Sequence, residues 1–458
     1  MRARKLTAGL LTLATSVAVI AAVAAATAPT ASAQYAQKWV TSWAAAPQGP
    51  YPSGNAVAQP DLSFAFPTPS ANDQTFRLIV HPDLWSPATR VRFTNVFGAQ
   101  PVTFDGVFIG LQKSGATIEP GTNTPVTFNG GGGSVTVQPG QSVWSDPVPL
   151  RFVRGGGGGQ QYGRDPQYLA GRRLAISFHT VGQTGPMTWH AKAVTTSYVS
   201  DPGAGSVGAA EDDAALPTST TSWYFVDALD MAAPVDTQLV VALGDSITDG
   251  TSSTINGDDR WPDVLARRLH ERYGRRVVVV NEGIGGNQII GPATYSISDP
   301  FSGGPAAVQR VGRDVLSLSG VTAVIWLEGT NDVTAGAAAP DIEAGMKAVV
   351  GLLRASLPGI RVVGGTITSE VGAAGNGGTP AAAAERQELN AFIRTSGLFD
   401  AVADFDAVTV DPQTGALRAK FVPNTSVGGP GDYVHPNRAG YLAMGYAIDL
   451  ASLVRPFP

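Results

Sequence analysis

The chain has 458 residues, of which 55 are glycine, 33 are proline and none is cysteine. Hydrophobic residues make up 43%, charged residues 15%, and the formal net charge is −5, so the chain has ample apolar material for a packed core and lacks the basic surface that nucleic-acid binding requires. The absence of cysteine excludes disulfides, thiolate metal sites and a cysteine nucleophile.

The first 33 residues are predicted to be a secretory signal peptide. Three basic residues precede an uncharged run at 6–26, and the segment ends in Ala31-Ser32-Ala33, which is the pattern of a cleaved export signal. A membrane anchor is the alternative, but the alanine content, Pro29 and the small-residue motif favour cleavage. Removing the segment leaves 28 basic and 36 acidic residues, a net charge of −8. No later run reaches 18 apolar residues, so we expect an extracellular protein without stable membrane insertion.

Residues 34–236 are predicted to form an all-β domain. Short runs of β-branched and aromatic residues alternate with clusters of Gly, Pro, Asn and Asp, which is the pattern of strands separated by turns. No stretch of a dozen residues has helical periodicity, so a sandwich or jelly roll is expected. The expected strands include residues 77–80, 89–94, 107–109, 134–137 and 174–178.

Three features of this β-rich half have both a structural and a functional interpretation. Glycine runs at 130–133 and 155–159 are interpreted as flexible loops, because neither opens a helix with a lysine, as a phosphate site would. Residues 203–220 are small and acidic, which suits a mobile loop. Six tryptophans are interpreted as core and interface residues, although exposed ones would be able to stack on sugar rings. They are Trp39, Trp43, Trp85, Trp144, Trp189 and Trp223.

Residues 237–458 are predicted to form an α/β domain with a parallel sheet. Residues 239–243 are a continuous apolar run, typical of a parallel strand buried on both faces. Further strands are expected at 277–280, 321–327, 361–363 and 401–405, and helices at 260–273, 306–318, 341–357, 380–394 and 438–453. This alternation predicts a sheet with helices on both faces and a site at the carboxyl ends of its strands.

Residues suited to nucleophilic catalysis follow two of these elements. Ser246 comes directly after the first strand, but a serine needs a neighbouring base to act as a nucleophile. Among five histidines, His435 lies three residues after Asp432, where a carboxylate can reach the second ring nitrogen and fix the tautomer. Taken alone, this pair also fits a simple capping turn. His270, on an arginine-rich helix, is interpreted as a solvated surface residue.

Two further strand ends supply hydrogen-bond donors. A glycine-rich segment follows the second strand at 281–287, and Gly329-Thr330-Asn331-Asp332 follows the third. Glycine N–H groups and an asparagine amide are suited to binding a tetrahedral oxyanion. A tight turn and a self-capping loop are the simpler alternatives, but four separate segments that each supply a required group favour a catalytic site.

With these four blocks the chain resembles the GDSL, or SGNH, hydrolase superfamily, whose blocks centre on Ser, Gly, Asn and His. Here they are Gly244-Asp245-Ser246, residues 281–286, Gly329-Thr330-Asn331-Asp332 and Asp432-Tyr433-Val434-His435, in the family's order. The resemblance covers about half of the mature chain and implies a flavodoxin-like, three-layer α/β/α fold for 237–458. With the motif Arg260-Trp261-Pro262-Asp263 and the β-rich half, the chain is similar to secreted two-part members from actinobacteria.

The resemblance implies a serine mechanism that needs no metal and no organic cofactor. Ser246 would be the nucleophile, His435 the base, and Asp432 the residue that orients His435. The backbone N–H groups of Ser246 and Gly286 and the side-chain amide of Asn331 would form the oxyanion hole. Gly286 matches the family's oxyanion glycine better than the other glycines of its block.

The expected function is therefore that of a secreted esterase or lipase whose partner is a lipid, aryl or acetylated-carbohydrate ester. A carbohydrate O-acetylesterase acting on acetylated polysaccharide is the alternative, because no residue separates these substrate classes or distinguishes hydrolysis from acyl transfer. A carbohydrate-binding protein with an inactive hydrolase half is an alternative of another class, against which the intact site residues argue. No nucleic-acid partner is expected, and the sequence carries no signal for an oligomeric state.

Overall fold

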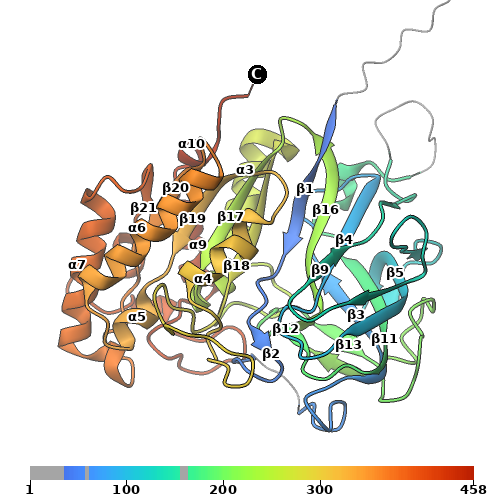
Figure 1. The fold of residues 1–458 in the computed structure, drawn as a ribbon. Coiled ribbons are helices and arrows are strands. Elements are labelled where there is room, and N and C mark those ends of the chain that lie inside the picture. The colour runs from blue at the N-terminus through green and yellow to red at the C-terminus, as the bar shows by residue number, and fades with distance from the viewer. Residues whose placement is uncertain (1–35, 57–60, 155–162, 458) are drawn as a thin grey trace, which may run out of the picture.

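The computed structural model describes residues 36–56, 61–154 and 163–457, which form a β-rich half followed by a half built on a parallel sheet (Figure 1). The expected signal peptide, residues 1–33, and the glycine run at 155–159 lie outside the described residues. Among the helices described, none is both long and apolar enough to cross a lipid bilayer.

The β-rich half is a sandwich of two antiparallel sheets, as its alternating sequence predicts. Its smaller sheet has the order β1 (Gln37–Ala44), β16 (Val226–Pro234), β4 (Ala88–Thr94) and β10 (Val148–Pro149), with β9 (Ser142–Trp144) also paired to β4. Its larger sheet has the order β14 (Thr218–Thr220), β13 (Ser197–Val199), β3 (Asn72–Val80), β11 (Leu174–Gln183), β5 (Val102–Ser114) and β6 (Thr117–Ile118), with β7 (Thr124–Pro125) and β8 (Ser134–Val137) also paired to β5.

Aromatic side chains fill the space between these two sheets. Phe93 of the smaller sheet contacts Phe104 and Phe178 of the larger one, with ring centroids 4.9 and 5.3 Å apart. Such pairs add about 0.5–1.5 kcal/mol each beyond the area they bury. Phe93, Phe104 and Phe178 are fully buried, and they belong to a hydrophobic core that continues into the parallel sheet of the second half.

The tryptophans of this half are packing residues. Four of them are buried: Trp43, Trp85, Trp189 and Trp223. The other two are partly buried and lie against the guanidinium of Arg90, whose Cζ is 4.9 Å from the ring centroid of Trp39 and 4.3 Å from that of Trp144. This agrees with the packing interpretation, because none of these six tryptophans is exposed.

The segment at 203–220 differs from the expected mobile loop. The guanidinium of Arg77, which is fully buried, donates hydrogen bonds to the carbonyl oxygens of Ala210 at 2.5 Å and Asp212 at 2.9 Å. The last three residues of the segment form β14. The small, acidic composition of this segment suggested a loop without fixed contacts. The group that holds the segment is the guanidinium of Arg77, which lies in β3, more than 120 residues earlier in the chain.

The second half has a five-stranded parallel sheet with the order β18 (Val277–Gly283), β17 (Gln238–Gly244), β19 (Val321–Leu327), β20 (Arg361–Gly365) and β21 (Ala401–Ala403). Numbered along the chain, this order is 2-1-3-4-5, which is that of flavodoxin-like folds. The apolar run at 239–243 is fully buried, as a central strand covered on both faces requires. The predicted fold class is therefore confirmed.

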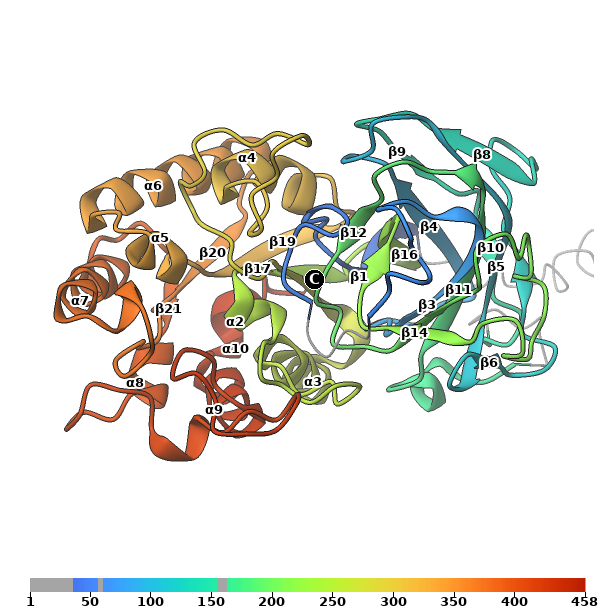
Figure 2. The same cartoon turned by 90° about the horizontal axis from the view of Figure 1, so that it is seen from below.

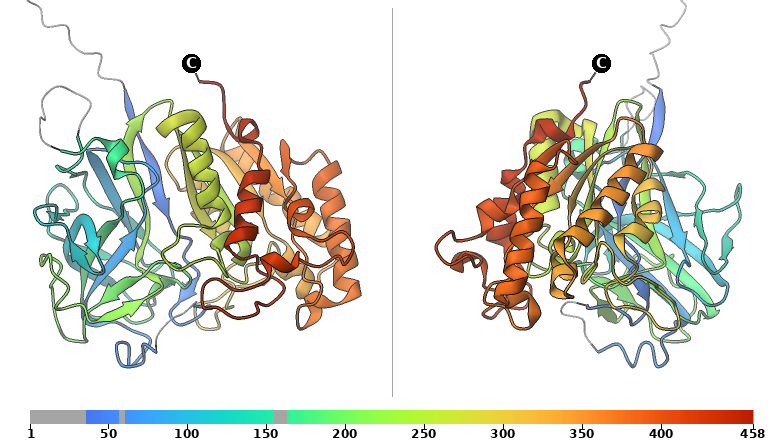
Figure 3. Two further views of the ribbon diagram at one scale, coloured as in Figure 1. Left: turned by 180° about the vertical axis from the view of Figure 1, so that it is seen from behind. Right: turned by 60° about the vertical axis from the view of Figure 1, so that its left-hand side comes forward.

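Helices cover both faces of the parallel sheet (Figure 2). One face carries α4 (Ala307–Val311) and α6 (Ala339–Ser356), with α7 (Pro380–Thr395) packed beside α6. The other face carries α3 (Trp261–Tyr273), α9 (Arg438–Ala447) and α10 (Leu450–Leu453). α3 and α9 lie side by side there (Figure 3).

Three expected elements end earlier than predicted, each for a local reason. The last helix stops at Ala447, because Ile448 is extended and Asp449 caps the separate helix α10 through the N–H of Ala451. The last strand stops at Ala403, because Asp404 similarly caps α8 (Phe405–Thr409). The helix expected at 306–318 is α4 followed by a π-helical turn at Gly312–Leu316.

The two halves share an extended boundary. β1 lies beside β18, the edge strand of the parallel sheet (Figure 1), and the Thr41 N–H donates to the Ser319 carbonyl oxygen at 3.0 Å. A small three-stranded sheet of β15 (Trp223–Tyr224), β12 (Thr188–His190) and β2 (Gly49–Pro50) also lies at this boundary (Figure 2). The β-rich half is thus packed against the second half through hydrogen bonds and strand contacts, and is not merely joined to it by the chain.

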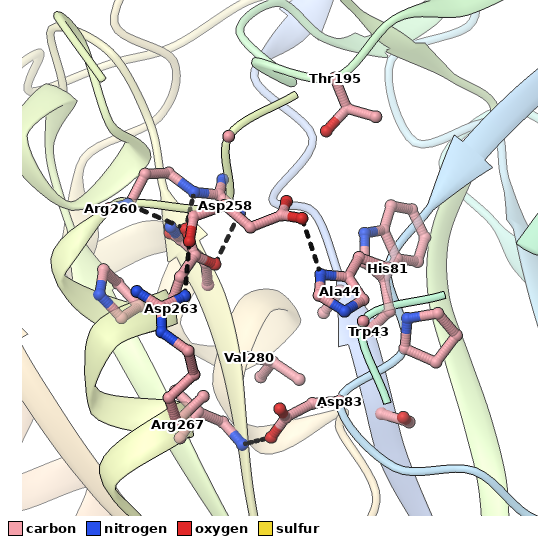
Figure 4. Close-up of a pocket in the computed structure, with 18 of the residues that line it drawn as sticks. Trp43, Ala44, His81, Asp83, Thr195, Asp258, Arg260, Asp263, Arg267 and Val280 are labelled. Carbon is pink, nitrogen blue, oxygen red and sulfur yellow. Dashed lines mark hydrogen bonds and ion pairs between the residues drawn. The ribbon is translucent and has the colours of Figure 1, made fainter. Parts of the chain in front are cut away.

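Three histidine–aspartate ion pairs cross this boundary. His81–Asp258, His190–Asp249 and His270–Asp83 each have a nitrogen–oxygen distance of 3.2 Å. These residues line a cavity of about 420 Å³ between the halves, and Figure 4 shows Asp258 facing His81 across it. The interpretation of His270 as a solvated surface residue was wrong, because its imidazole pairs with the opposite half.

We expect these pairs to make the folded protein less stable as the pH rises. Burial lowers the pKa of each imidazole, but the hydrogen bond and charge of its aspartate outweigh that effect and raise the pKa above 6.5. A histidine of this kind stabilises the fold fully below its unfolded pKa, and the stabilisation is lost as the pH rises through the folded pKa.

The measurement is the melting temperature between about pH 6 and pH 9 of the wild type and of the double variant His81→Gln/His270→Gln. The wild-type value should fall more steeply, because the variant lacks two of the titrating pairs while other titrating groups contribute equally to both. Parallel curves would contradict the expectation.

Candidate active site

Ser246 stands at the carboxyl edge of the parallel sheet, where β17 turns into the short helix α2 (Ser246–Asp249). The preceding Asp245 caps that helix, because its Oδ1 accepts the N–H of Ile247 at 2.9 Å. Gly244 allows the turn: a Cβ there would lie 2.2 Å from the carbonyl oxygen of Leu327. The local sequence therefore places a largely buried serine, 7% exposed, above the sheet.

His435 and Asp432 reach Ser246 from the loop before α9. His435 Nε2 lies 2.7 Å from Ser246 Oγ, and His435 Nδ1 lies 2.6 Å from Asp432 Oδ2. The other carboxylate oxygen accepts the backbone N–H groups of Val434 and His435, both at 2.9 Å. Tyr433 adopts the left-handed conformation that this tight turn requires, with φ at 65°.

The electrostatics of the turn fix the tautomer of His435. Burial raises the pKa of the Asp432 carboxyl, but hydrogen bonds from the His435 ring and from two backbone N–H groups outweigh that effect and hold its pKa well below the ordinary range. An ionised carboxylate only accepts hydrogen bonds, so Nδ1 carries the proton that faces Asp432. The lone pair of Nε2 then faces the hydroxyl of Ser246, which is the arrangement of a general base.

The glycine-rich segment that begins at the last residue of β18, residues 283–287, is called the oxyanion loop below. The N–H of Gly283 donates to Asn281 Oδ1 at 2.9 Å, and that of Gly285 donates to Asp249 Oδ2 at 3.1 Å. Gly286 has φ at 82°, and its N–H has no acceptor among the described residues. Of the three glycines, Gly286 is therefore the one whose N–H is free to face a substrate.

Asn331 joins the oxyanion loop from α5 (Thr330–Thr334), which follows β19. Its Nδ2 donates to the carbonyl oxygen of Asn287 at 2.9 Å, which uses one N–H of the amide and leaves the other available. The neighbouring Asp332 accepts the N–H groups of Ile289 and Ile290, and burial raises its pKa to about 7. Asn331 thus ties the loop to α5, and Asp332 ties the residues that follow the loop to the same helix.

Arg310 of α4 also holds the oxyanion loop, and the sequence did not mark it as a site residue. Its side chain is fully buried and donates to the carbonyl oxygens of Gly244 at 2.8 Å and Glu282 at 2.9 Å, and to Asn287 Oδ1 at 2.6 Å. It also pairs with Asp314 at 3.0 Å. An arginine on the same helix face as the apolar Ala307 and Val311 was the signal available in the sequence.

The β-rich half also reaches this site, which the sequence analysis did not foresee. Gln48 donates a hydrogen bond to the Gly285 carbonyl oxygen at 3.2 Å, and His190 pairs with Asp249 behind the oxyanion loop. Lys192 is buried beside them and donates to Thr251 Oγ1 at 2.5 Å. All the site residues proposed from the sequence lie in the second half, so these three complete the surroundings of the site.

The fold and the site together define the class of protein. A parallel sheet that brings a serine, a histidine and an aspartate into one hydrogen-bonded chain beside free N–H donors is the arrangement of a serine-type hydrolase. Residues 242–443 match the model of the GDSL-like lipase/acylhydrolase family. This half of the chain belongs to that family, within the GDSL/SGNH hydrolase superfamily, and the protein is a hydrolase of the GDSL type.

Solved structures similar to this half come from several bacteria. An aryl esterase from M. smegmatis is 18% identical over 47% of this chain and 100% of its own, with a TM-score of 0.36. A member of the lipolytic G-D-S-L family from Veillonella parvula is 16% identical over 46% of this chain and 95% of its own, with a TM-score of 0.34. A GDSL-like lipase from Bacteroides thetaiotaomicron is 19% identical over 47% and 88%, with a TM-score of 0.33. None of the curated proteins compared with the chain matches it.

Proposed function

We propose that this protein is a secreted carboxylic ester hydrolase that works through an acyl-enzyme on Ser246. The observation that carries the proposal is the hydrogen-bonded chain from Ser246 Oγ to His435 Nε2 at 2.7 Å and from His435 Nδ1 to Asp432 Oδ2 at 2.6 Å. Membership of an acylhydrolase family supports the acyl group as the one transferred. Secretion is part of the proposal and rests on the pattern of residues 1–33.

In the first half of the reaction, Ser246 Oγ attacks the ester carbonyl carbon while its proton passes to His435 Nε2. Asp432 stabilises the imidazolium that forms. The carbonyl oxygen becomes an oxyanion and accepts hydrogen bonds from the N–H groups of Ser246 and Gly286 and from the Asn331 amide. The C–O bond to the alcohol then breaks, and His435 returns the proton to the leaving oxygen.

In the second half of the reaction, water repeats these steps on the acyl-enzyme. His435 takes a proton from the water, the hydroxyl attacks the acyl carbon, and the same donors hold the second oxyanion. Collapse releases the carboxylic acid and returns the proton to Ser246 Oγ. In both halves of the reaction, His435 takes up and returns each proton that is transferred.

We expect the folded protein to be labelled by a fluorophosphonate at Ser246, because the probe reacts with a serine activated by a neighbouring base. Labelling is measured by mass spectrometry of the digested protein, and turnover is measured on nitrophenyl esters from acetate to palmitate. A folded protein that takes no label and hydrolyses no ester would defeat the proposal and favour a binding protein with an inactive hydrolase half. A sharp optimum at acetate, with acetate released from acetylated xylan, would narrow the function to a carbohydrate O-acetylesterase.

A further inference from the structure

Gln48 of the β-rich half holds the oxyanion loop through a single peptide group. Its side chain is 1% exposed, and its Nε2 donates to the carbonyl oxygens of Gly285, at 3.2 Å, and Ser302. Both partners are acceptors only, so the NH₂ end of the amide must face them. Its Oε1 has no hydrogen-bond partner within the described residues. The side chain therefore serves as a donor to these two carbonyl groups.

The Gly285 carbonyl oxygen and the Gly286 N–H belong to the same peptide group. In a planar trans peptide these two groups point in opposite directions. A donor that fixes the direction of the Gly285 carbonyl thereby fixes the direction of the Gly286 N–H, which is the free donor of the loop. Gln48 therefore acts on the oxyanion hole indirectly: it orients the peptide that carries the Gly286 N–H and does not itself contact a substrate.

The peptide needs such an external contact because it joins two glycines. Neither residue has a Cβ to restrict rotation about the bonds that flank the peptide, and Gly286 already adopts φ of 82°. A Cβ at Gly285 would lie 2.9 Å from Lys192 Nζ, so a side chain there would have to displace the end of that lysine. The orientation of this peptide is therefore set by contacts from outside the loop.

The preceding peptide is held from the β-rich half as well. The Gly285 N–H donates to Asp249 Oδ2 at 3.1 Å, and Asp249 Oδ1 faces His190 Nε2 at 3.2 Å. The His190 nitrogens also face the carbonyl oxygens of Ala46 at 2.9 Å and Lys192 at 3.1 Å. Because every partner is an acceptor, both ring nitrogens must donate, and His190 is an imidazolium paired with a buried carboxylate.

We propose that Gln48 is a positioning residue of the oxyanion hole, which makes the β-rich half a working part of the catalytic site. The proposal rests on the proposed ester hydrolysis and deepens it. Losing one oxyanion donor costs about 10²–10³ in kcat in other acyl hydrolases. A donor that is present but no longer held should cost less, so we expect kcat of Gln48→Met to fall about 10- to 100-fold.

The variant Gln48→Met keeps the length of the side chain and removes its donors. Steady-state kinetics on a nitrophenyl ester should show the loss in kcat with KM unchanged within about threefold, because the missing interaction acts on the transition state. The affinity for phenylboronic acid, which forms a tetrahedral adduct on the serine, should fall in parallel with kcat/KM. A merely structural role would leave the boronate affinity of the folded variant unchanged.

Gln74→Met is the matched control. Gln74 is fully buried in the same half, and its Nε2 donates to the Ser200 carbonyl oxygen at 2.9 Å, away from the oxyanion loop. This control should lose stability without losing kcat. Should Gln48→Met fail to fold, Gln48→Leu provides the same test with a smaller side chain.

Two results would overturn the proposal: wild-type kcat and boronate affinity in Gln48→Met, or an equal loss in Gln74→Met. A wild-type protein that hydrolyses no ester would instead overturn the proposed function. In that case crystals of the wild type and of Gln48→Met still decide the positioning role. A Gly285–Gly286 peptide that turns or becomes disordered in the variant supports it, and an unchanged peptide overturns it.

Discussion

Replacing Ser246 by alanine should lower kcat for ester hydrolysis by about 10⁴- to 10⁶-fold, the range found when triad members are removed from other serine hydrolases. The physical reason is that the 2.7 Å contact with His435 Nε2 activates the Ser246 hydroxyl as the attacking group. Asp432→Asn should cost about 10⁴-fold, because an amide in that place no longer favours the tautomer with a free Nε2. The measurement is kcat on the best nitrophenyl ester.

The control for this prediction is Ser253→Ala. Ser253 is fully buried four residues beyond α2, and its Oγ donates to the Gly250 carbonyl oxygen at 2.6 Å, so its loss tests packing without touching His435. We expect its kcat to stay within a few-fold of the wild type. Substantial activity in a folded Ser246→Ala protein would remove Ser246 as the nucleophile and end the proposed mechanism.

Residues 237–458 expressed alone should give an aggregated or inactive protein. The truncation uncovers the side of β18 on which β1 lies and removes Val40, which is fully buried against the loop before β19. It also leaves Asp249 without His190, and removing one partner of a buried ion pair costs about 3–5 kcal/mol. The Gly285 carbonyl loses Gln48 at the same time.

The matched protein for the truncation is the chain from residue 36 to 458, which lacks only the segment before β1. Soluble yield, melting temperature and kcat of the two proteins should be compared under one set of conditions. A soluble fragment with native activity would contradict the expectation, and it would show that the β-rich half is a detachable module. A soluble fragment whose kcat is lower than that of the 36–458 protein would agree with the positioning role of Gln48.

The sequence predicted the sheet and its order of elements well where the physical signal is local. The run at 239–243 is apolar at every position because a central parallel strand is covered on both faces. Ser246, Asn331 and His435 were proposed because each follows a sheet strand or precedes a helix, where parallel sheets bind ligands. The structure brings Ser246, Asp432 and His435 into contact, with Gly286 on the oxyanion loop and Asn331 in α5 beside them.

The sequence did not predict where elements break or which distant residues support the site. The end of α9 at Ala447 depends on one capping carboxylate, a signal too short to separate from a continuous helix. Gln48 and the oxyanion loop are more than 230 residues apart, and a glutamine in a loop has no periodic pattern that marks it. Arg310 lies in a helix that the sequence predicted, but its contacts with the site were not predicted.

The sequence by itself determined the class of chemistry: a chain without cysteine that places a serine, a histidine and an aspartate at strand ends can supply only an oxygen nucleophile among these groups. Only the tertiary structure decided which glycine N–H is free and what holds it. That N–H is defined by the hydrogen bonds its neighbours make, and one of the contacts comes from Gln48 in the other half of the molecule. The nucleophile and the base follow from side-chain chemistry that can be read in the sequence, whereas the direction of a peptide group between two glycines is fixed by hydrogen bonds from residues distant in the sequence.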